Sequence, residues 1–325
     1  MRTVASIAGV VVLVLLALLV LAWLALRRGD ISYTELEARY ASPASRYLDL
    51  SNGLRVHYRD EGRRDGPALV LLHGFGASLH TWEPWVRELG DSYRVVSLDF
   101  PAFGLTRAPD GFRTGGAAHV QTVDAVAQHL GLDRFTVVGN SMGGAAAWAY
   151  ALAHPQRLNA LVLVDPAGWP QPVSDGAGRG PWIFRLLNYP IGRALLRDLD
   201  ASSLTAQGLR SAFVDDTLVT PAMVRRYTDL SRGPGHRALI LQPGGEPSPA
   251  TPEQLGTISV PTLVLSGEQD EIIPVEQARR FAAAIPGAML ITYPDVGHLP
   301  QEEIPERSAA DVRRFLEGPG KPTRR

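Results

Sequence analysis

Short, continuously apolar segments recur along this chain and constrain its fold more than any other feature. Each is bounded by Gly, Asp or Pro, and helix-length segments separate them. Strands of a parallel sheet that are buried on both faces have this composition. The predicted strands are residues 68–72, 93–98, 135–138, 161–164, 262–265 and 289–293. The predicted helices are residues 81–90, 116–131, 142–154, 275–284 and 305–316. The alternation predicts an α/β fold with a mainly parallel sheet.

Two other segments extend this prediction. Residues 47–50 and 54–58 alternate around Asn52-Gly53, which predicts an antiparallel hairpin. The interval 168–256 contains no segment typical of a buried strand, and a structureless loop of that length is uncommon. We therefore expect a helical insertion there, placed as a lid. Its amphipathic segments are 182–188, 191–199, 203–213 and 221–230.

The N-terminal segment has a different composition. Residues 4–26 carry no charged side chain, and as a helix they would span roughly 34 Å, enough for the hydrocarbon core of a bilayer. This predicts a single membrane anchor over residues 1–28, in a bacterial inner membrane. A cleaved signal peptide and a buried core helix are the alternatives, and the sequence offers no convincing cleavage site. The side of the membrane stays open, because Arg2 flanks one end and Arg27 and Arg28 flank the other.

The predicted organisation follows from these segments. It comprises a membrane anchor (1–28), an irregular polar stalk (27–45), a first core part (45–167), a helical cap (168–256), a second core part (257–316) and a disordered tail (317–325). The 325 residues include 32 basic and 33 acidic side chains, a balance that gives no electrostatic argument for a nucleic-acid partner. The absence of cysteine excludes a thiol nucleophile, disulfides and cysteine zinc sites.

A serine lies between a predicted strand and a predicted helix. Residues 139–144 read Gly-Asn-Ser-Met-Gly-Gly, a G-x-S-x-G pattern directly after the strand 135–138. A serine on such a sharp turn exposes its Oγ at the sheet edge, and its neighbours must be small. The N-terminus of the following helix also favours a developing negative charge. Ser141 is therefore the candidate nucleophile.

A nucleophilic serine needs a base, and the base needs a carboxylate. His298 follows the last predicted strand, in the loop that leaves the same sheet edge as Ser141. Asp270 follows the strand 262–265 and opens on that edge, although Glu268 and Glu271 lie close to it in sequence. Asp165, at the end of the strand 161–164, is the alternative acid; its other interpretation is a turn or capping aspartate.

Two backbone donors are expected to stabilise the oxyanion. The first is the N–H of Met142, the residue after the candidate nucleophile. The second is the N–H of Phe75, in the loop His73-Gly74-Phe75-Gly76, where two glycines permit close approach to a ligand. His73 is interpreted as a hydrogen-bonding residue that shapes this loop.

These motifs resemble the α/β-hydrolase superfamily over residues 45–316. The resemblance rests on HGFG at 73–76, DFPAFG at 99–104, GNSMGG at 139–144, GEQDEIIP at 267–274 and GH at 297–298. It implies an eight-stranded, mostly parallel sheet flanked by helices, with a helical cap inserted after the sixth strand. Ala102 departs from the glycine that is usual in the family. Ser141 stands where haloalkane dehalogenases and epoxide hydrolases of this fold have aspartate.

Two subgroups of the superfamily are similar to this sequence. The meta-cleavage-product hydrolases split a C–C bond in dienoate ring-fission products, and they often share GNSMGG. The membrane-anchored monoacylglycerol lipases and esterases share an N-terminal membrane helix. A dienoate would require a nearby cation, such as Arg185 or Arg193. Apolar cap residues could instead form an entrance for lipids or pack against the core; they are Trp169, Trp182, Phe184, Leu186 and Leu187.

The expected function is a serine hydrolase that cleaves hydrophobic or lipid-type carboxylic esters through an acyl-enzyme. Its expected partners are a small hydrophobic ester and the membrane, with no cofactor, metal or nucleic acid. The main alternative is a C–C bond hydrolase of meta-cleavage products. A ligand-binding member without activity and a perhydrolase-type enzyme are further alternatives. Acyl-chain length and oligomeric state stay open.

Overall fold

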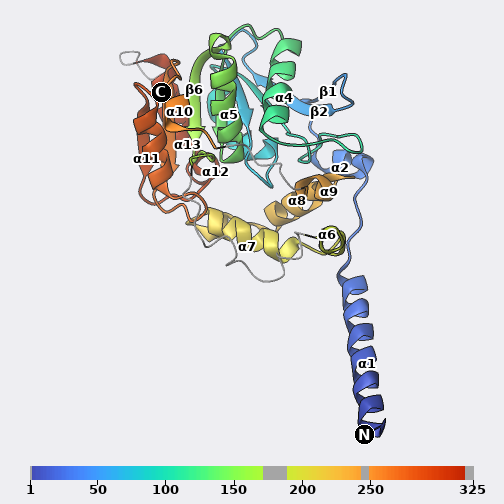
Figure 1. Cartoon of the computed structure of the whole chain (residues 1–325). Helices are drawn as coiled ribbons and strands as arrows, with labels where there is room; N and C mark the ends of the chain where they lie inside the picture. Colours follow the sequence, from blue (N-terminus) through green and yellow to red (C-terminus); the bar gives the residue numbers. More distant parts are fainter. Residues whose placement is uncertain (1, 171–188, 243–248, 319–325) are drawn as a thin grey trace.

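A single eight-stranded sheet forms the centre of the computed structural model, which describes residues 2–170, 189–242 and 249–318 (Figure 1). The strands lie in the order β1-β2-β4-β3-β5-β6-β7-β8. Their bounds are β1 Ser45–Asp49, β2 Arg55–Gly62, β3 Ala68–Leu72, β4 Arg94–Leu98, β5 Phe135–Asn140, β6 Leu158–Val164, β7 Thr262–Gly267 and β8 Met289–Tyr293. Strands β1 and β2 form the predicted antiparallel hairpin, β2 pairs antiparallel with β4, and the pairs from β4 to β8 are parallel. The predicted α/β fold with a mostly parallel eight-stranded sheet is therefore confirmed.

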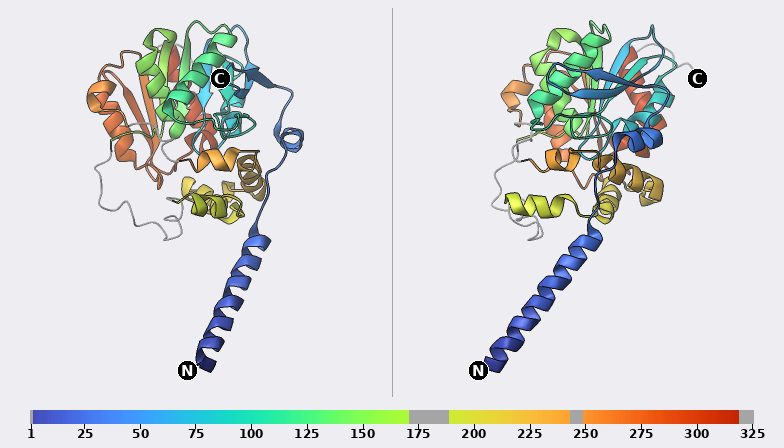
Figure 2. Two further views of the ribbon diagram at one scale, coloured as in Figure 1. Left: turned by 45° about the vertical axis from the view of Figure 1, so that its right-hand side comes forward. Right: turned by 90° about the vertical axis from the view of Figure 1, so that its right-hand side faces the viewer.

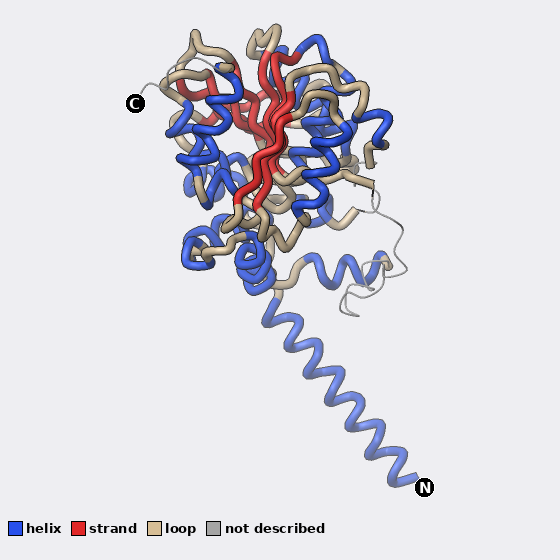
Figure 3. Tube along the Cα trace, turned by 90° about the vertical axis from the view of Figure 1, so that its left-hand side faces the viewer, coloured by secondary structure: helices blue, strands red, loops and turns tan. Residues whose placement is uncertain are grey.

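Helices cover both faces of this sheet, as the edge-on view in Figure 3 shows. One face carries α4 (Gly116–His129), α5 (Met142–Ala153) and α11 (Val275–Ala284), and the other carries α3 (Glu83–Leu89) and α13 (Pro305–Glu317). Alternate residues of a strand point to opposite faces. Val70 and Leu72 accordingly pack in the first apolar cluster, and Leu69 and Leu71 in the second. Burial on both faces explains why these strands have no polar alternation.

The interval between β6 and β7 is helical over its described residues. It contains α6 (Pro190–Arg197), α7 (Ser202–Ala212), α8 (Pro221–Ser231), α9 (His236–Ile240) and α10 (Pro252–Leu255). Figures 1 and 2 show α6 to α9 grouped at one end of the sheet. The predicted helix 182–188 and residues 319–325 of the predicted tail lie outside the described residues.

The segment predicted as an irregular stalk contains a short helix, α2 (Tyr33–Tyr40). The Ser32 side chain caps it by accepting a hydrogen bond from the Glu35 N–H. Leu36 is fully buried in a small cluster with Leu105 and Leu230. Leu36 is the one fully buried residue of this helix, so the helix depends on contacts with distant parts of the chain.

The N-terminal helix α1 (Arg2–Leu26) projects away from the other elements (Figures 1 and 2). A spanning helix needs roughly 20 consecutive, predominantly apolar residues. Within the part of the chain that the structure describes, no helix meets the requirement of length and apolarity for crossing a membrane. This finding overturns the predicted transmembrane anchor over residues 1–28, and with it the predicted membrane contact and localisation.

Candidate active site

Ser141 lies on a sharp turn between β5 and α5. Its φ of 55° is in the left-handed region, which is uncommon for a residue other than glycine. A Cβ on Gly139 would lie 2.0 Å from the Gly143 carbonyl oxygen, and a Cβ on Gly143 would lie 2.1 Å from the Leu72 carbonyl oxygen. The turn therefore requires glycine at both positions, as the sequence analysis predicts for a G-x-S-x-G turn.

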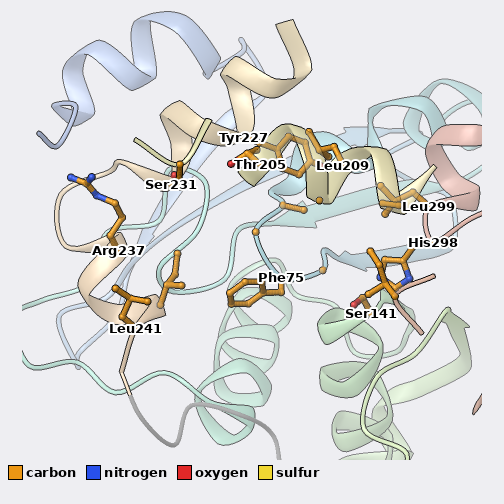
Figure 4. Close-up of a pocket in the computed structure, with 18 of the residues that line it drawn as sticks. Phe75, Ser141, Thr205, Leu209, Tyr227, Ser231, Arg237, Leu241, His298 and Leu299 are labelled. Carbon is orange, nitrogen blue, oxygen red and sulfur yellow. The ribbon is translucent and has the colours of Figure 1, made fainter. Parts of the chain in front are cut away.

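Asp270 and His298 come together across the sheet edge. The His298 Nδ1 lies 2.6 Å from the Asp270 Oδ2, and both residues are buried. The other oxygen of Asp270 accepts the N–H groups of Ile272 and Ile273, at 2.7 and 2.9 Å. These bonds fix the carboxylate in the turn after β7. Figure 4 shows the Ser141 side chain beside the His298 ring.

Asp165, the alternative acid, has other hydrogen-bond partners. Its Oδ1 accepts the Ser266 hydroxyl at 2.7 Å and the Gly267 N–H at 3.1 Å, and its backbone has a φ of 44°. Burial and the nearby Asp270 raise the pKa of Asp165 well above its usual range. Neither of the two hydrogen bonds of Asp165 involves His298. The geometry thus matches the interpretation of Asp165 as a turn residue.

These three side chains also form a group that could hold a metal ion. One ligand atom from each of Asp165, Asp270 and His298 lies within 4.8 Å of the others. The Nδ1 of His298 is already bonded to Asp270, and Asp165 bonds to the β7 backbone. Hydrogen bonds therefore account for most of this cluster without a metal ion.

The loop after β3 approaches Ser141 closely. A Cβ on Gly74 would lie 3.1 Å from the Ser141 Cβ, so glycine permits this approach. His73 is buried; its Nδ1 donates to the Gly74 carbonyl at 2.7 Å, and its Nε2 accepts the Phe100 N–H at 3.0 Å. It shapes the loop as expected. Met142 is the first residue of α5, where a backbone N–H has no acceptor within the helix.

A family model described as the alpha/beta hydrolase fold matches residues 67–305, which are more than half of the chain. The chain belongs to the α/β-hydrolase family. The resemblance predicted from the motifs is confirmed. The relatives of this α/β hydrolase include a dienoate hydrolase, as the predicted similarity to meta-cleavage-product hydrolases implies.

Three similar proteins differ in the activity their names describe. A 2-hydroxy-6-oxo-6-phenylhexa-2,4-dienoate hydrolase of Burkholderia cepacia is 30% identical over 264 residues, 78% of this chain and 88% of that protein. Haloalkane dehalogenase 2 of Mycobacterium tuberculosis is 29% identical over 282 residues, 83% and 94% of the two chains. The crystal structure of a membrane phospholipase A gives a TM-score of 0.69 at 26% identity and covers 96% of this chain and 97% of its own. These similarities support a hydrolase and leave its substrate open.

The α/β hydrolase has a cavity of about 480 Å³ at this site. Ser141 and His298 line it together with mostly apolar side chains (Figure 4). Leu209, Tyr227 and Leu241 come from the interval between β6 and β7. The sequence analysis did not single out these wall residues. Their amphipathic helical pattern indicated one apolar face for each helix, but not the surface that the face contacts.

Two arginines also line the cavity, and both are paired. The Arg197 guanidinium donates to both oxygens of Asp198, at 2.7 and 3.1 Å. The Arg237 guanidinium donates to the Arg28 carbonyl and to Asp30, at 2.8 and 2.7 Å. Figure 4 shows it directed away from Ser141. The charges of both side chains are thus partly compensated by the protein itself.

The cap residues named from the sequence divide into two groups. Trp169 packs edge-to-face on Phe281, with ring centroids 5.4 Å apart, so it contributes to core packing. Arg193 lies in α6. The remaining candidates lie outside the described residues; they are Trp182, Phe184, Arg185, Leu186 and Leu187.

Proposed function

We propose that this α/β hydrolase is a serine hydrolase that cleaves hydrophobic carboxylic esters, with Ser141 as nucleophile, His298 as base and Asp270 as the acid that orients it. The observation that carries the proposal is the 2.6 Å hydrogen bond between Asp270 and His298 beside Ser141 on its strained turn. A serine hydroxyl is a weak nucleophile, and this arrangement supplies the base and the orienting carboxylate that it needs.

The proposed reaction has two stages. His298 accepts the Ser141 proton while Oγ attacks the ester carbonyl, and the N–H groups of Phe75 and Met142 stabilise the oxyanion. His298 then protonates the leaving alcohol, which leaves an acyl group on Ser141. Water, deprotonated by His298, attacks this acyl-enzyme; collapse of the second oxyanion releases the carboxylic acid and returns the proton to Ser141.

The lining of the cavity favours an uncharged ester over a substrate that carries a carboxylate. Its walls are mostly apolar, and among its described lining residues the two arginines already bond to Asp198 and Asp30. A carboxylate brought into this cavity would have to replace those partners or remain poorly solvated. The helices of the interval 168–256 are proposed to act as the cap that selects the acyl chain.

A panel of p-nitrophenyl esters of increasing chain length tests this proposal. We expect turnover that is largest for medium or long acyl chains, loss of turnover in Ser141→Ala, and labelling of Ser141 by a fluorophosphonate. A folded protein that shows neither ester turnover nor labelling would refute the serine esterase.

The second candidate is C–C bond hydrolysis of a dienoate ring-fission product. It is favoured by the Burkholderia cepacia relative, which is 30% identical over 78% of this chain. Parallel assays with a monoacylglycerol and with 2-hydroxy-6-oxo-6-phenylhexa-2,4-dienoate separate the two reactions. A higher kcat/KM for the dienoate would reverse the preference for esters.

A further inference from the structure

The loop that carries His298 is bonded to the end of α7 as well as to the sheet. The His298 N–H donates to the Ala212 carbonyl at 2.7 Å. A Cβ on the preceding Gly297 would lie 2.5 Å from that same oxygen, so the two backbones are in close contact. Ala212 is the last residue of α7 and also lines the cavity.

The backbone carbonyl of His298 is bonded to the core of the protein. The Asn140 side-chain amide donates to the His298 carbonyl at 3.1 Å and to the Val164 carbonyl at 3.2 Å. His298 is thus bonded through its N–H to the interval between β6 and β7, and through its carbonyl to the turn before Ser141. A displacement of α7 would act directly on the backbone of His298.

One carboxylate joins the same two segments a second time. Glu303, at the end of α12 (Pro300–Glu303), accepts the N–H groups of Val214 and Asp215 on Oε1, at 2.8 and 3.0 Å. Its Oε2 accepts the Gly297 N–H at 2.8 Å. Glu303 therefore binds both the segment that follows α7 and the loop that holds His298. Without the carboxylate, these three backbone N–H groups lose their acceptor.

We propose that Glu303 is a positioning residue that couples the seating of α7 to the alignment of His298. The proposal rests on the proposed role of His298 as base. Leu209 and Ala212 of α7 line the cavity, so a substrate that packs against α7 also stabilises the position of the base. Small misplacements of a catalytic group lower the rate strongly, because the reacting atoms leave their productive geometry.

Glu303→Gln and Glu303→Ala test this coupling. Gln keeps one acceptor oxygen but turns an NH₂ group toward the other N–H partner, whereas Ala removes both acceptors. We expect kcat on a p-nitrophenyl ester to fall by about tenfold in Gln and about a hundredfold in Ala, with KM changed less than threefold. The rate of fluorophosphonate labelling should fall in parallel, since it also needs His298.

Asp311→Asn is the matched control. It removes a buried carboxylate that accepts the Tyr293 hydroxyl at 3.0 Å, away from the α7 contact. We expect its melting temperature to fall as in Glu303→Gln, with little change in kcat. If both Glu303 variants are destabilised but keep the wild-type kcat, Glu303 has only a structural role and the proposal is wrong.

A spectroscopic readout keeps this test separate from the proposed esterase activity. The proton between His298 Nδ1 and Asp270 should give a low-field ¹H signal in ¹⁵N-histidine-labelled wild-type protein. We expect the signal to weaken or shift in Glu303→Ala and to persist in Asp311→Asn. A wild-type protein without ester turnover would refute the proposed function, whereas an unchanged signal in Glu303→Ala would refute the coupling.

Discussion

The edge of the sheet and the helical interval between β6 and β7 contribute to the same cavity in different ways. The sheet edge supplies Ser141, Asp270 and His298 from turns fixed by buried strands and close backbone packing. The interval supplies cavity walls from helices that contact other segments through ion pairs, such as Asp198 with Arg27, and through apolar packing, such as that of Leu209 with Leu299. Chemistry is therefore expected to depend on the sheet edge, and substrate choice on the interval.

The largest effect is expected from a comparison of two aspartates on the sheet edge. Asp270→Asn should lower kcat by about 10³–10⁴-fold, as in other serine triads, because the amide can no longer stabilise the His298 imidazolium. Asp165→Asn should lower kcat less than tenfold, because the Asp165 carboxyl group bonds to Ser266 and Gly267 and not to His298. Steady-state kinetics on one ester measures both variants. A larger loss in Asp165→Asn would identify Asp165 as the acid.

A smaller effect is expected from a charge in the interval. Asp198→Asn removes the carboxylate bonded to Arg197 and leaves this cavity-lining guanidinium less compensated. The measured quantity is the ratio of kcat/KM for an ester with a terminal carboxylate to kcat/KM for a neutral ester of equal length. This ratio should be about tenfold higher in Asp198→Asn than in the wild type, which corresponds to about 1.4 kcal/mol.

Asp200→Asn is the control for this charge change. Asp200 pairs with Arg28, which does not line the cavity, with 3.2 Å between the charged atoms. The ratio of the two kcat/KM values should stay unchanged in this variant. An equal rise in both variants would indicate a general electrostatic effect. No rise in either variant would mean that Asp198 does not influence the choice of substrate.

The smallest effect concerns the contact between the two regions. Glu302 accepts the Thr81 hydroxyl at 2.5 Å and the Tyr227 hydroxyl at 3.4 Å, and burial raises its pKa to about 7. Since the unfolded chain has the usual value of 4.5, the folded state binds more protons between pH 4.5 and 7. The free energy of unfolding should therefore decrease as the pH rises through this window.

Thermal unfolding of the wild type and Glu302→Gln at pH 5 and pH 8 checks this expectation. Gln cannot ionise, so the variant should lose less stability between the two pH values than the wild type does. Identical pH dependence in the two proteins would mean that Glu302 does not titrate in this range.

Local patterns were sufficient for much of the fold. Continuous apolar segments indicated the strands, because a strand covered by helices on both faces has no polar side. The same reasoning failed for α2, whose single buried residue, Leu36, contacts Leu105 and Leu230 far away in the sequence. Composition also led to the wrong prediction of a membrane anchor, since among the described residues no helix meets the requirement for spanning a membrane.

Residue patterns alone predict the parallel sheet, the turn that carries Ser141 and the shared edge at which Asp270 and His298 emerge, because strand periodicity and glycine placement are local properties. Three contacts follow only from the folded arrangement: Asp270 rather than Asp165 bonds His298, Asp30 pairs with Arg237 of the cavity, and Glu303 bonds the segment after α7. These contacts join residues that are distant in the sequence, and they form only once the layers have packed and brought the carboxylates beside their partners.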